Sequence, residues 1–533
     1  MLILREETSR SGGSSRALSN NIAAARLVSE LVRTSLGPKG MDKMLVDPVG
    51  DVTITNDGAT MLGEMDVQHP AAKMVIETAR AVDSGVGDGT TSVVVLIGAL
   101  LGNAEDLIDS GVHPTVIASG YSRAALKAGS VLKEIAVAVN PDDTAMLARI
   151  ARTSMASKLV SSESGRLAEL VVKALLVLAE KKGDGIGVDT DNLAVKKAAG
   201  GSLNDTALVL GVILERGIVH SGMPKRIEGA RILLLKSPVE IEKTKLDAKV
   251  EIDDPVQIQG FLDAEAGMLG GMVEKVVLAG ANVLVCQKGI DPAAQSRLAK
   301  AGVLSIARAK ESEMAALAKA TGAAIVTGFE DISAEDMGRA GLVEERVVEG
   351  NKLTFVEGCK NPMAVTLFVR GGSQRVVDEA ERSIHDAVMV VKSVIESPAV
   401  VGGGGAAEEE VSRRLMSWSG GLEGREQLAA QKFAEALESI PLTLGENAGF
   451  DTLDTQVELR ERHSVQGSWY GVDVLGKGVK DTFRLGVIEP LALKEHVVRA
   501  AAECACMILR IDDVIASRRE GRAPAVSPSV MGG

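Results

Sequence analysis

Hydrophobic residues change their spacing along this 533-residue chain. Over residues 21–34 and 371–397 they recur every three or four positions, which predicts two amphipathic helices. Residues 140–199 also follow a mainly helical pattern. From about residue 206 to 356, short apolar runs alternate with helical stretches, which predicts a separate α/β domain and a multidomain α/β fold class. The strands expected in that region are 207–214, 231–235, 282–286 and 324–326.

The length and the charge of the chain limit the number of domains and the kinds of partner that we expect. A domain typically has ~100 to 200 residues, so 533 residues are expected to form about three domains. The 72 acidic and 59 basic residues give a formal charge of -13, which repels phosphate backbones, and only 2% of the residues are aromatic. Nucleic acid is therefore not an expected partner.

Neither a membrane nor export is expected. The longest apolar run, 93–101, has about half of the ~20 residues that a membrane-spanning helix needs, so it is predicted to be a buried helix. The N-terminal residues MLILREETSRSGGSSR lack the apolar stretch and the cleavage site of a signal peptide. Four scattered cysteines do not suit a disulfide framework, and the apolar run around Cys504 and Cys506 favours core packing over metal binding. We expect a cytoplasmic protein.

Three polar loops that contain glycine fall within about 60 residues of sequence. Residues 87–92 read GDGTTS and open a predicted helix, where free backbone N–H groups and the helix dipole attract phosphate. Asp88 is suited to hold Mg²⁺, which prefers one or two carboxylates together with phosphate oxygens and water. The loops GPKG at 37–40 and NDG at 56–58 offer another close backbone approach and another carboxylate. An ordinary helix cap is an equal alternative for GDGTTS, and an ordinary turn is favoured for the other two loops taken alone.

Two further glycine-rich segments resemble nucleotide signatures. Residues 471–477 nearly fit a Walker A loop, but Gly478 replaces the Ser or Thr that binds Mg²⁺, and the surrounding pattern predicts a hairpin. Residues 402–407 fit a dinucleotide fingerprint after a predicted strand, although the three glutamates that follow would repel a pyrophosphate. A dinucleotide-binding metabolic enzyme that uses residues 402–407 is therefore the alternative function.

A series of motifs carries a resemblance to a known family. In chain order they are SLGPKGMDKMLVD, ITNDGAT, HPAAKM, VGDGTTS, ERSIHDA, VVGGGGAAEEE, ENAGFDTLD and GVIEP. In this combination the chain resembles the group II chaperonins, the thermosome and its eukaryotic cytosolic relatives, over essentially its whole length. The resemblance implies an ATP-dependent chaperone that encloses non-native proteins in a double-ring chamber and couples ATP hydrolysis to lid closure.

The resemblance also implies a chaperonin fold in which the chain passes up and back through three domains. The equatorial ATPase domain is mainly helical, the intermediate domain is a small α/β hinge, and the apical α/β domain carries a helical protrusion as a built-in lid. The expected borders are 1–141 and 400–533 for the equatorial domain, 142–207 and 365–399 for the intermediate domain and 208–364 for the apical domain, with the lid at about 242–275 and a mobile tail at about 518–533.

Cofactors and partners follow from the same resemblance. ATP and Mg²⁺ are expected, and K⁺ is a further candidate. The expected partners are non-native client proteins and copies of the chain, or paralogous subunits, in two stacked rings of eight or nine. No separate lid protein is expected.

The resemblance assigns roles to residues that match the motifs of the family. Asp386 and Asp57 are the expected catalytic acids and Asp88 is the expected metal ligand. The expected nucleotide-binding residues are Ser35, Leu36, Gly37, Pro38, Asn56, Gly87, Asp88, Gly89, Thr90, Thr91, Ser92, Lys158, Gly403, Gly404, Asn447, Ala448 and Glu489. Of these, Glu489 is implied to contact the ribose, Asn447 and Ala448 to lie near the adenine, and Lys158 to sense the γ-phosphate.

The sequence also predicts whether the side chain of Asp386 is exposed to solvent. It lies two positions after Ile384 of the apolar stripe, which is about 200° around a helix, so it is expected to be exposed. Periodicity alone favours an ordinary solvated face there, and only the resemblance indicates chemistry.

Overall fold

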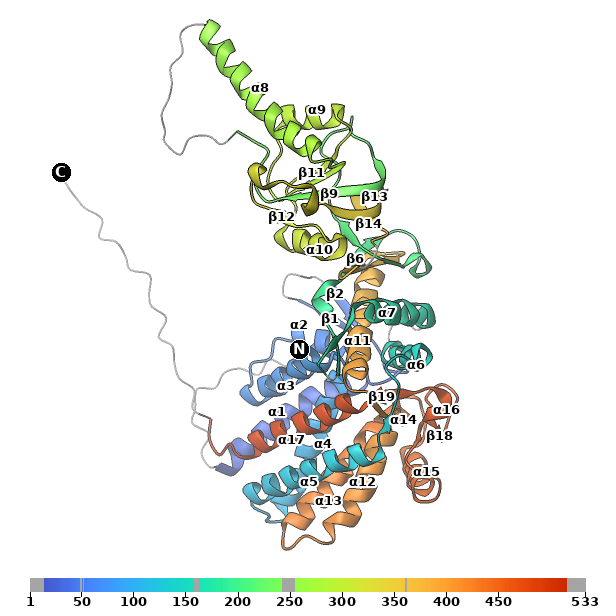
Figure 1. Cartoon of the computed structure of the whole chain (residues 1–533). Coiled ribbons are helices and arrows are strands. Elements are labelled where there is room, and N and C mark those ends of the chain that lie inside the picture. Colours follow the sequence, from blue (N-terminus) through green and yellow to red (C-terminus); the bar gives the residue numbers. More distant parts are fainter. Residues whose placement is uncertain are drawn as a thin grey trace, which may run out of the picture.

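The computed structural model describes residues 14–47, 50, 52–157, 163–183, 185–241, 255–359 and 362–514. These residues form three bodies, one above the other (Figure 1). The lower body is helical and contains both the first and the last described elements. A narrow middle body joins it to an upper body in which helices flank a sheet.

The lower body takes its helices from both ends of the chain. They are α1 (Ser14–Arg33), α2 (Gly58–Glu64), α3 (Pro70–Val86), α4 (Thr90–Asp109), α5 (Pro114–Ile135), α12 (Ala406–Ser419), α13 (Glu426–Leu437), α14 (Ser439–Asn447), α15 (Thr452–Val465), α16 (Thr482–Leu485) and α17 (Leu491–Leu509). The α1 helix begins before the predicted range 21–34. Cys504 and Cys506 are buried in the core on α17, as predicted.

Helix α4 lies at the centre of the lower body and contacts α1, α3, α5, α13 and α17. Its residues Val93, Val94, Leu96 and Ile97 are completely buried. This explains why α4, alone among the described helices, is long and apolar enough to cross a membrane by length and composition. The prediction of a buried helix at 93–101 is confirmed.

The lower body contains short antiparallel strands as well. The strands β1 (Lys43–Val46) and β2 (Val52–Thr55) pair as one hairpin, and β17 (Tyr470–Val472) and β18 (Val479–Asp481) pair as another. The second hairpin confirms the reason for rejecting a Walker A loop at 471–477. A third small sheet has the order β19 (Ile488–Pro490), β16 (Ala399–Gly402), β3 (Val137–Ala138).

The middle body is built from α6 (Thr144–Met155), α7 (Ser164–Leu178) and α11 (Gln374–Glu396), whose apolar faces share one core. The prediction of a mainly helical region at 140–199 is wrong in its last part. There the chain forms β4 (Ala179–Lys182), β5 (Gly185–Val188) and β6 (Leu193–Ala199). Strand β6 pairs in parallel with β15 (Val365–Gly371), a partner more than 150 residues further along the chain, so no local pattern could reveal it.

The upper body has a mixed sheet of the order β11-β10-β9-β13-β14-β8, and β12 also pairs with β9. Its strands are β8 (Val212–Leu214), β9 (Arg226–Leu235), β10 (Val283–Cys286), β11 (Leu304–Ile306), β12 (Ile325–Val326), β13 (Gly338–Val348) and β14 (Asn351–Glu357), and its helices are α8 (Pro255–Leu278), α9 (Pro292–Lys300) and α10 (Glu311–Thr321). Residues alternate along β9: Ile232 and Leu234 face the core under α10, whereas Leu233 and Leu235 face the core under α8 and α9.

The predicted strand at 207–214 is in fact two strands that belong to different bodies. Strand β7 (Ala207–Val209) pairs with β15 in the middle body, and β8 pairs with β14 in the upper body. Gly211 separates them with φ of 149°, and a Cβ at Gly211 would lie 2.0 Å from the carbonyl oxygen of Val356. A glycine is therefore needed where the chain passes between the bodies.

Candidate functional site

The loops at 56–58 and 87–92 meet at the start of α4. Gly87 ends α3 with φ of 75°, and Gly89 precedes α4 with φ of 82°. The N-cap residue of α4 is Gly89, which offers no side-chain cap to the N–H groups of the first turn, and a helix start of this kind suits an anion. A Cβ on Gly58 would lie 2.5 Å from Thr91 Oγ1 and 2.8 Å from Thr90 Oγ1, so the 56–58 loop lies directly against this turn.

A side chain of α14 holds the loop at 35–38 through hydrogen bonds. Asn447 Nδ2 donates to the carbonyl oxygens of Arg33 at 3.1 Å and Leu36 at 2.9 Å. Gly37 has φ of 82°, and a Cβ there would lie 2.3 Å from Leu444 Cδ2. Asn447, predicted to lie near an adenine, thus has the structural role of holding this loop.

A cavity of about 210 Å³ brings many of the predicted residues together. Those that line it are Leu36, Gly37, Pro38, Asp88, Gly89, Ser92, Gly404 and Glu489. Two buried polar atoms on its lining, Ser154 Oγ and Glu408 Oε2, have no hydrogen-bond partner among the described residues. Gly37 and Gly89 have no room for a side chain, so their backbone lines the cavity directly, and the cavity suits a polar ligand.

Asp57 and Asp386 line a second cavity, of about 530 Å³. Asp57 caps α2: its Oδ2 accepts from Thr60 N at 2.9 Å and from Thr60 Oγ1 at 2.8 Å. Arg382 of α11 donates to the same hydroxyl at 3.3 Å. The helix that carries Asp386 is thus connected to the loop that carries Asp57.

The expectation that Asp386 is exposed is wrong, since it retains only 8% of its accessible surface. The reason is tertiary packing: α11 is covered by α6 and α7 on its apolar stripe and by the end of α3 elsewhere. A Cβ on Gly87 would lie 2.3 Å from Met389 Cβ and 3.8 Å from Asp386 Cα. The loop at 87–89 therefore lies against α11 on one side, and Gly89 contacts α17 on the other.

The remaining predicted residues lie around these cavities. Asn56 donates through Nδ2 to the carbonyl oxygen of Ser157, and Ser157 lines the first cavity. Gly403 lies against Glu489, because a Cβ on Gly403 would be 2.8 Å from Glu489 Oε1. Ala448 ends α14 and packs on the core of the lower body. Lys158 lies outside the described residues.

Sequence analysis missed a buried lysine and its partner. Lys494 Nζ lies 2.8 Å from Glu408 Oε1 and also pairs with Glu489, and all three residues line the first cavity. Burial alone lowers the pKa of Lys494, but the two carboxylates outweigh it and hold the pKa above its ordinary value. Burial raises the pKa of Glu489; Lys494 opposes this rise, and Glu408 and Asp88 add to it. The only sequence signal was a lysine in an apolar helix, which does not name its partner.

The three glutamates at the start of α12 do not act as one repulsive charge, contrary to expectation. Glu408 pairs with Lys494, and Glu410 accepts hydrogen bonds from Arg413 and Arg414. Burial, with Glu438 nearby, raises the pKa of Glu409 to about 8, so it is mostly protonated at neutral pH.

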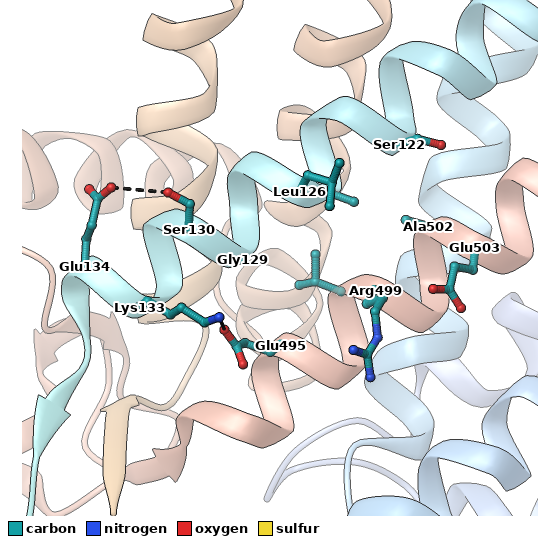
Figure 2. Close-up of a pocket in the computed structure, with 12 residues that line it drawn as sticks. Ser122, Leu126, Gly129, Ser130, Lys133, Glu134, Glu495, Arg499, Ala502 and Glu503 are labelled. Atoms are coloured by element: carbon teal, nitrogen blue, oxygen red, sulfur yellow. Dashed lines mark hydrogen bonds and ion pairs between the residues drawn. The ribbon is translucent and has the colours of Figure 1, made fainter. Parts of the chain in front are cut away.

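A larger cavity, of about 740 Å³, lies elsewhere, between α5 and α17 (Figure 2). Leu126 on its wall is 79% exposed, and Lys133 and Glu495 form an ion pair of 3.6 Å on its rim. None of the predicted site residues is among the described residues that line it.

The fold and the site together define a class of protein. A helical body that carries a cluster of glycine loops is joined through α11 to an α/β body with a projecting helix, α8 (Figure 1). This is the architecture of a chaperonin. Residues 28–519 match the TCP-1/cpn60 chaperonin family, and the chain belongs to this family.

Several similar proteins are thermosome subunits of archaea. A thermosome subunit of Methanopyrus kandleri is 52% identical over 498 residues, which cover 93% of this chain and 91% of the relative. The thermosome subunit beta of Archaeoglobus fulgidus is 52% identical over 518 residues, covering 97% and 95%. A thermosome subunit of Pyrococcus horikoshii is 49% identical over 519 residues, covering 97% and 94%.

The dinucleotide-enzyme alternative finds no support. The loop at 402–407 follows β16, which pairs only in antiparallel fashion with β19 and β3 among the described strands. The dinucleotide fingerprint belongs instead to a parallel βαβ unit.

Proposed function

We propose that this chain is an ATP-hydrolysing subunit of a group II chaperonin, which encloses non-native proteins in a chamber of two stacked rings. One observation carries the proposal. The loop at 87–92, suited to phosphate, belongs to the lower body, whereas Asp386 belongs to α11 of the middle body, and the two meet at Gly87. Hydrolysis that depends on this contact would be coupled to the movement of one body against the other.

The residues of the lower body would bind the triphosphate. The first-turn N–H groups of α4 and the hydroxyls of Thr90, Thr91 and Ser92 would donate to phosphate oxygens. No group of three or more His, Cys, Asp or Glu among the described residues is placed to hold a metal alone, so Asp88 would hold Mg²⁺ together with phosphate oxygens. Bound Mg²⁺ would neutralise phosphate charge, and K⁺ is a further candidate cation.

The acids would act on the attacking water. Asp57 and Asp386 line the same cavity, and we assign to Asp386 the proton transfer and to Asp57 the orientation of the water. Gly404 and Glu489 would contact the sugar from the first cavity, and the backbone at 35–38 would complete the phosphate site. Lys158 remains a proposed sensor of the γ-phosphate.

We further propose the domain division expected from the sequence. The buried core of the lower body draws on 18–135 and 401–509, and those of the upper body draw on 212–364. The core of the middle body draws on 147–188 and 365–400, together with Ile488. This supports equatorial, intermediate and apical domains.

The proposed lid, at about 242–275, includes most of α8, and residues 242–254 lie outside the described part. Helix α8 is anchored at its end by the buried residues Leu269 and Val273, whereas Met268 is 61% exposed. In Figure 1 the helix projects beyond the upper body, which suits a lid that belongs to the chain itself. We therefore propose that no separate lid protein is needed.

The proposed setting is the cytoplasm, and the proposed partners are non-native proteins and further subunits. All four cysteines lie in described parts of the chain, and they are free and buried, which suits a reducing compartment. Light scattering of the native protein with and without Mg-ATP tests the assembly. Sixteen chains of 55.5 kDa give about 0.9 MDa and eighteen about 1.0 MDa. A protein that stays a small oligomer both with and without Mg-ATP, and that does not hydrolyse added ATP, would contradict the proposal.

A further inference from the structure

A lysine is buried between two carboxylates beside the first cavity. The side chain of Lys494 is 7% exposed and that of Glu408 is 3% exposed. The side chain of Glu489 is 20% exposed, and it lines the cavity. The three residues come from different elements: Glu408 from α12, Glu489 from β19 and Lys494 from α17. Two of the three N–H donors of the ammonium group are therefore committed to carboxylates.

The carboxylate of Glu489 is held through one oxygen, and its other oxygen lies beside Gly403. Oε2 pairs with Lys494 Nζ, and Oε1 lies next to Gly403, where a Cβ would approach it to 2.8 Å. This leaves Glu489 little freedom to turn, although one side of it reaches the cavity. An acceptor that is already immobile loses less conformational entropy when a ligand binds.

The charge of the cluster indicates the chemical group that it accepts. One lysine and two glutamates leave a net charge of about -1, which repels phosphate but attracts neutral hydroxyl donors. Glu408 alone would balance Lys494. The second carboxylate, the one on the cavity, is therefore in excess of what the buried lysine needs.

We propose that Lys494 is a positioning residue that holds Glu489 as a fixed acceptor for the sugar hydroxyls and thereby selects ribonucleotides over 2′-deoxyribonucleotides. The inference rests on the proposed nucleotide site. It adds to that site a residue that acts through Glu489 rather than on the nucleotide itself.

The test is equilibrium binding of ADP and 2′-deoxy-ADP to the assembled protein by calorimetry, which does not depend on hydrolysis. We expect the wild type to bind ADP about 10- to 100-fold more tightly than 2′-deoxy-ADP, the range for one hydrogen bond to a charged group. In Lys494→Met this ratio should fall below about 3, because Glu489 is no longer held. Lys494→Arg should restore most of the ratio, since it keeps the charge.

A double-mutant comparison separates positioning from general damage. Glu489→Gln should lose the preference by itself, and adding Lys494→Met should cause no further loss, because both changes remove the same contact. Lys133→Met, which removes an exposed lysine that pairs with Glu495, should leave the ratio unchanged. If Lys494→Met does not assemble, Glu408→Gln with Lys494→Met removes one buried carboxylate together with the lysine and gives the same comparison.

The outcomes are distinct. A wild-type preference for ADP that persists in the assembled Lys494 variant would overturn the inference and leave the proposed function standing. No binding of either nucleotide to the wild type would overturn the proposed function itself.

Discussion

Substitution of Gly87 by alanine should slow ATP hydrolysis by separating two parts of the site. Gly87 has φ of 75°, and its Cβ would lie 2.3 Å from Met389 Cβ on α11. Carbon atoms pack at about 3.5 Å or more, so α11 must move away from the 87–89 loop by about 1 Å. The same movement carries Asp386 away from the phosphate-binding turn.

A misplacement of about 1 Å can cost about 100-fold in rate, which corresponds to about 2.7 kcal/mol of barrier. Single-turnover hydrolysis by the assembled Gly87→Ala protein should therefore slow by about this factor. ATP binding should change much less, because the first cavity is lined by other residues, among them Gly37, Asp88 and Gly404.

A matched control is available at Gly111. It has φ of 82°, but a Cβ there would meet nothing within 4 Å, so Gly111→Ala introduces the left-handed strain of about 1 kcal/mol without a clash. Gly111→Ala should hydrolyse ATP at close to the wild-type rate. Equal slowing in both variants would refute the reasoning, because backbone strain rather than the contact with α11 would then be the cause.

Three other predictions test separate parts of the proposal. Asp386→Ala should slow hydrolysis by roughly 10² to 10⁴ and leave ATP binding largely intact, and near-normal turnover would remove Asp386 from its assigned role. Deletion of about residues 244–268 should abolish the protection of an enclosed non-native protein from protease but leave ATPase activity, and retained protection would contradict the lid. Glu409→Gln should stabilise the folded protein at pH 8 but not at pH 4.5, as measured by thermal unfolding. The sign follows because burial, with Glu438 nearby, raises the pKa of Glu409 from 4.5 to about 8; the folded state keeps a proton that the unfolded chain has released, so wild-type stability falls as the pH rises through this range. An equal difference at both pH values would show that Glu409 is not protonated by burial.

Much of the local structure could be predicted from the sequence. Helices α1 and α11 follow from the spacing of their apolar residues, and α4 follows from a continuous apolar run. The hairpin of β17 and β18 was predicted from the pattern around residues 471–477. The loops at 37–40, 56–58 and 87–92 were predicted as possible ligand loops from residue types alone. These features depend on contacts between residues close in sequence, which is why pattern reasoning reaches them.

Which residues make up the candidate site was harder to predict from the sequence. Asp88 and Gly89 were found because they belong to one motif, and Asp386 and Glu489 were found only through the resemblance to the family. That Asn447 holds the 35–38 loop, and that Lys494 pairs with Glu408 and Glu489, required coordinates.

Tertiary structure decided the rest, and the physical reason is the same in each case. Strand β6 exists because β15 supplies its hydrogen bonds, and Asp386 is buried because the end of α3 covers the polar side of α11. The three glutamates of α12 are tolerated because Lys494, Arg413 and Arg414 reach Glu408 and Glu410 and because burial keeps Glu409 mostly protonated. The sequence by itself determined which segments form helices, hairpins and glycine loops. Only the packing of segments distant in the chain determined which charges are paired, which carboxylates are buried and which loops meet, because each of these depends on the partner that the fold brings into contact.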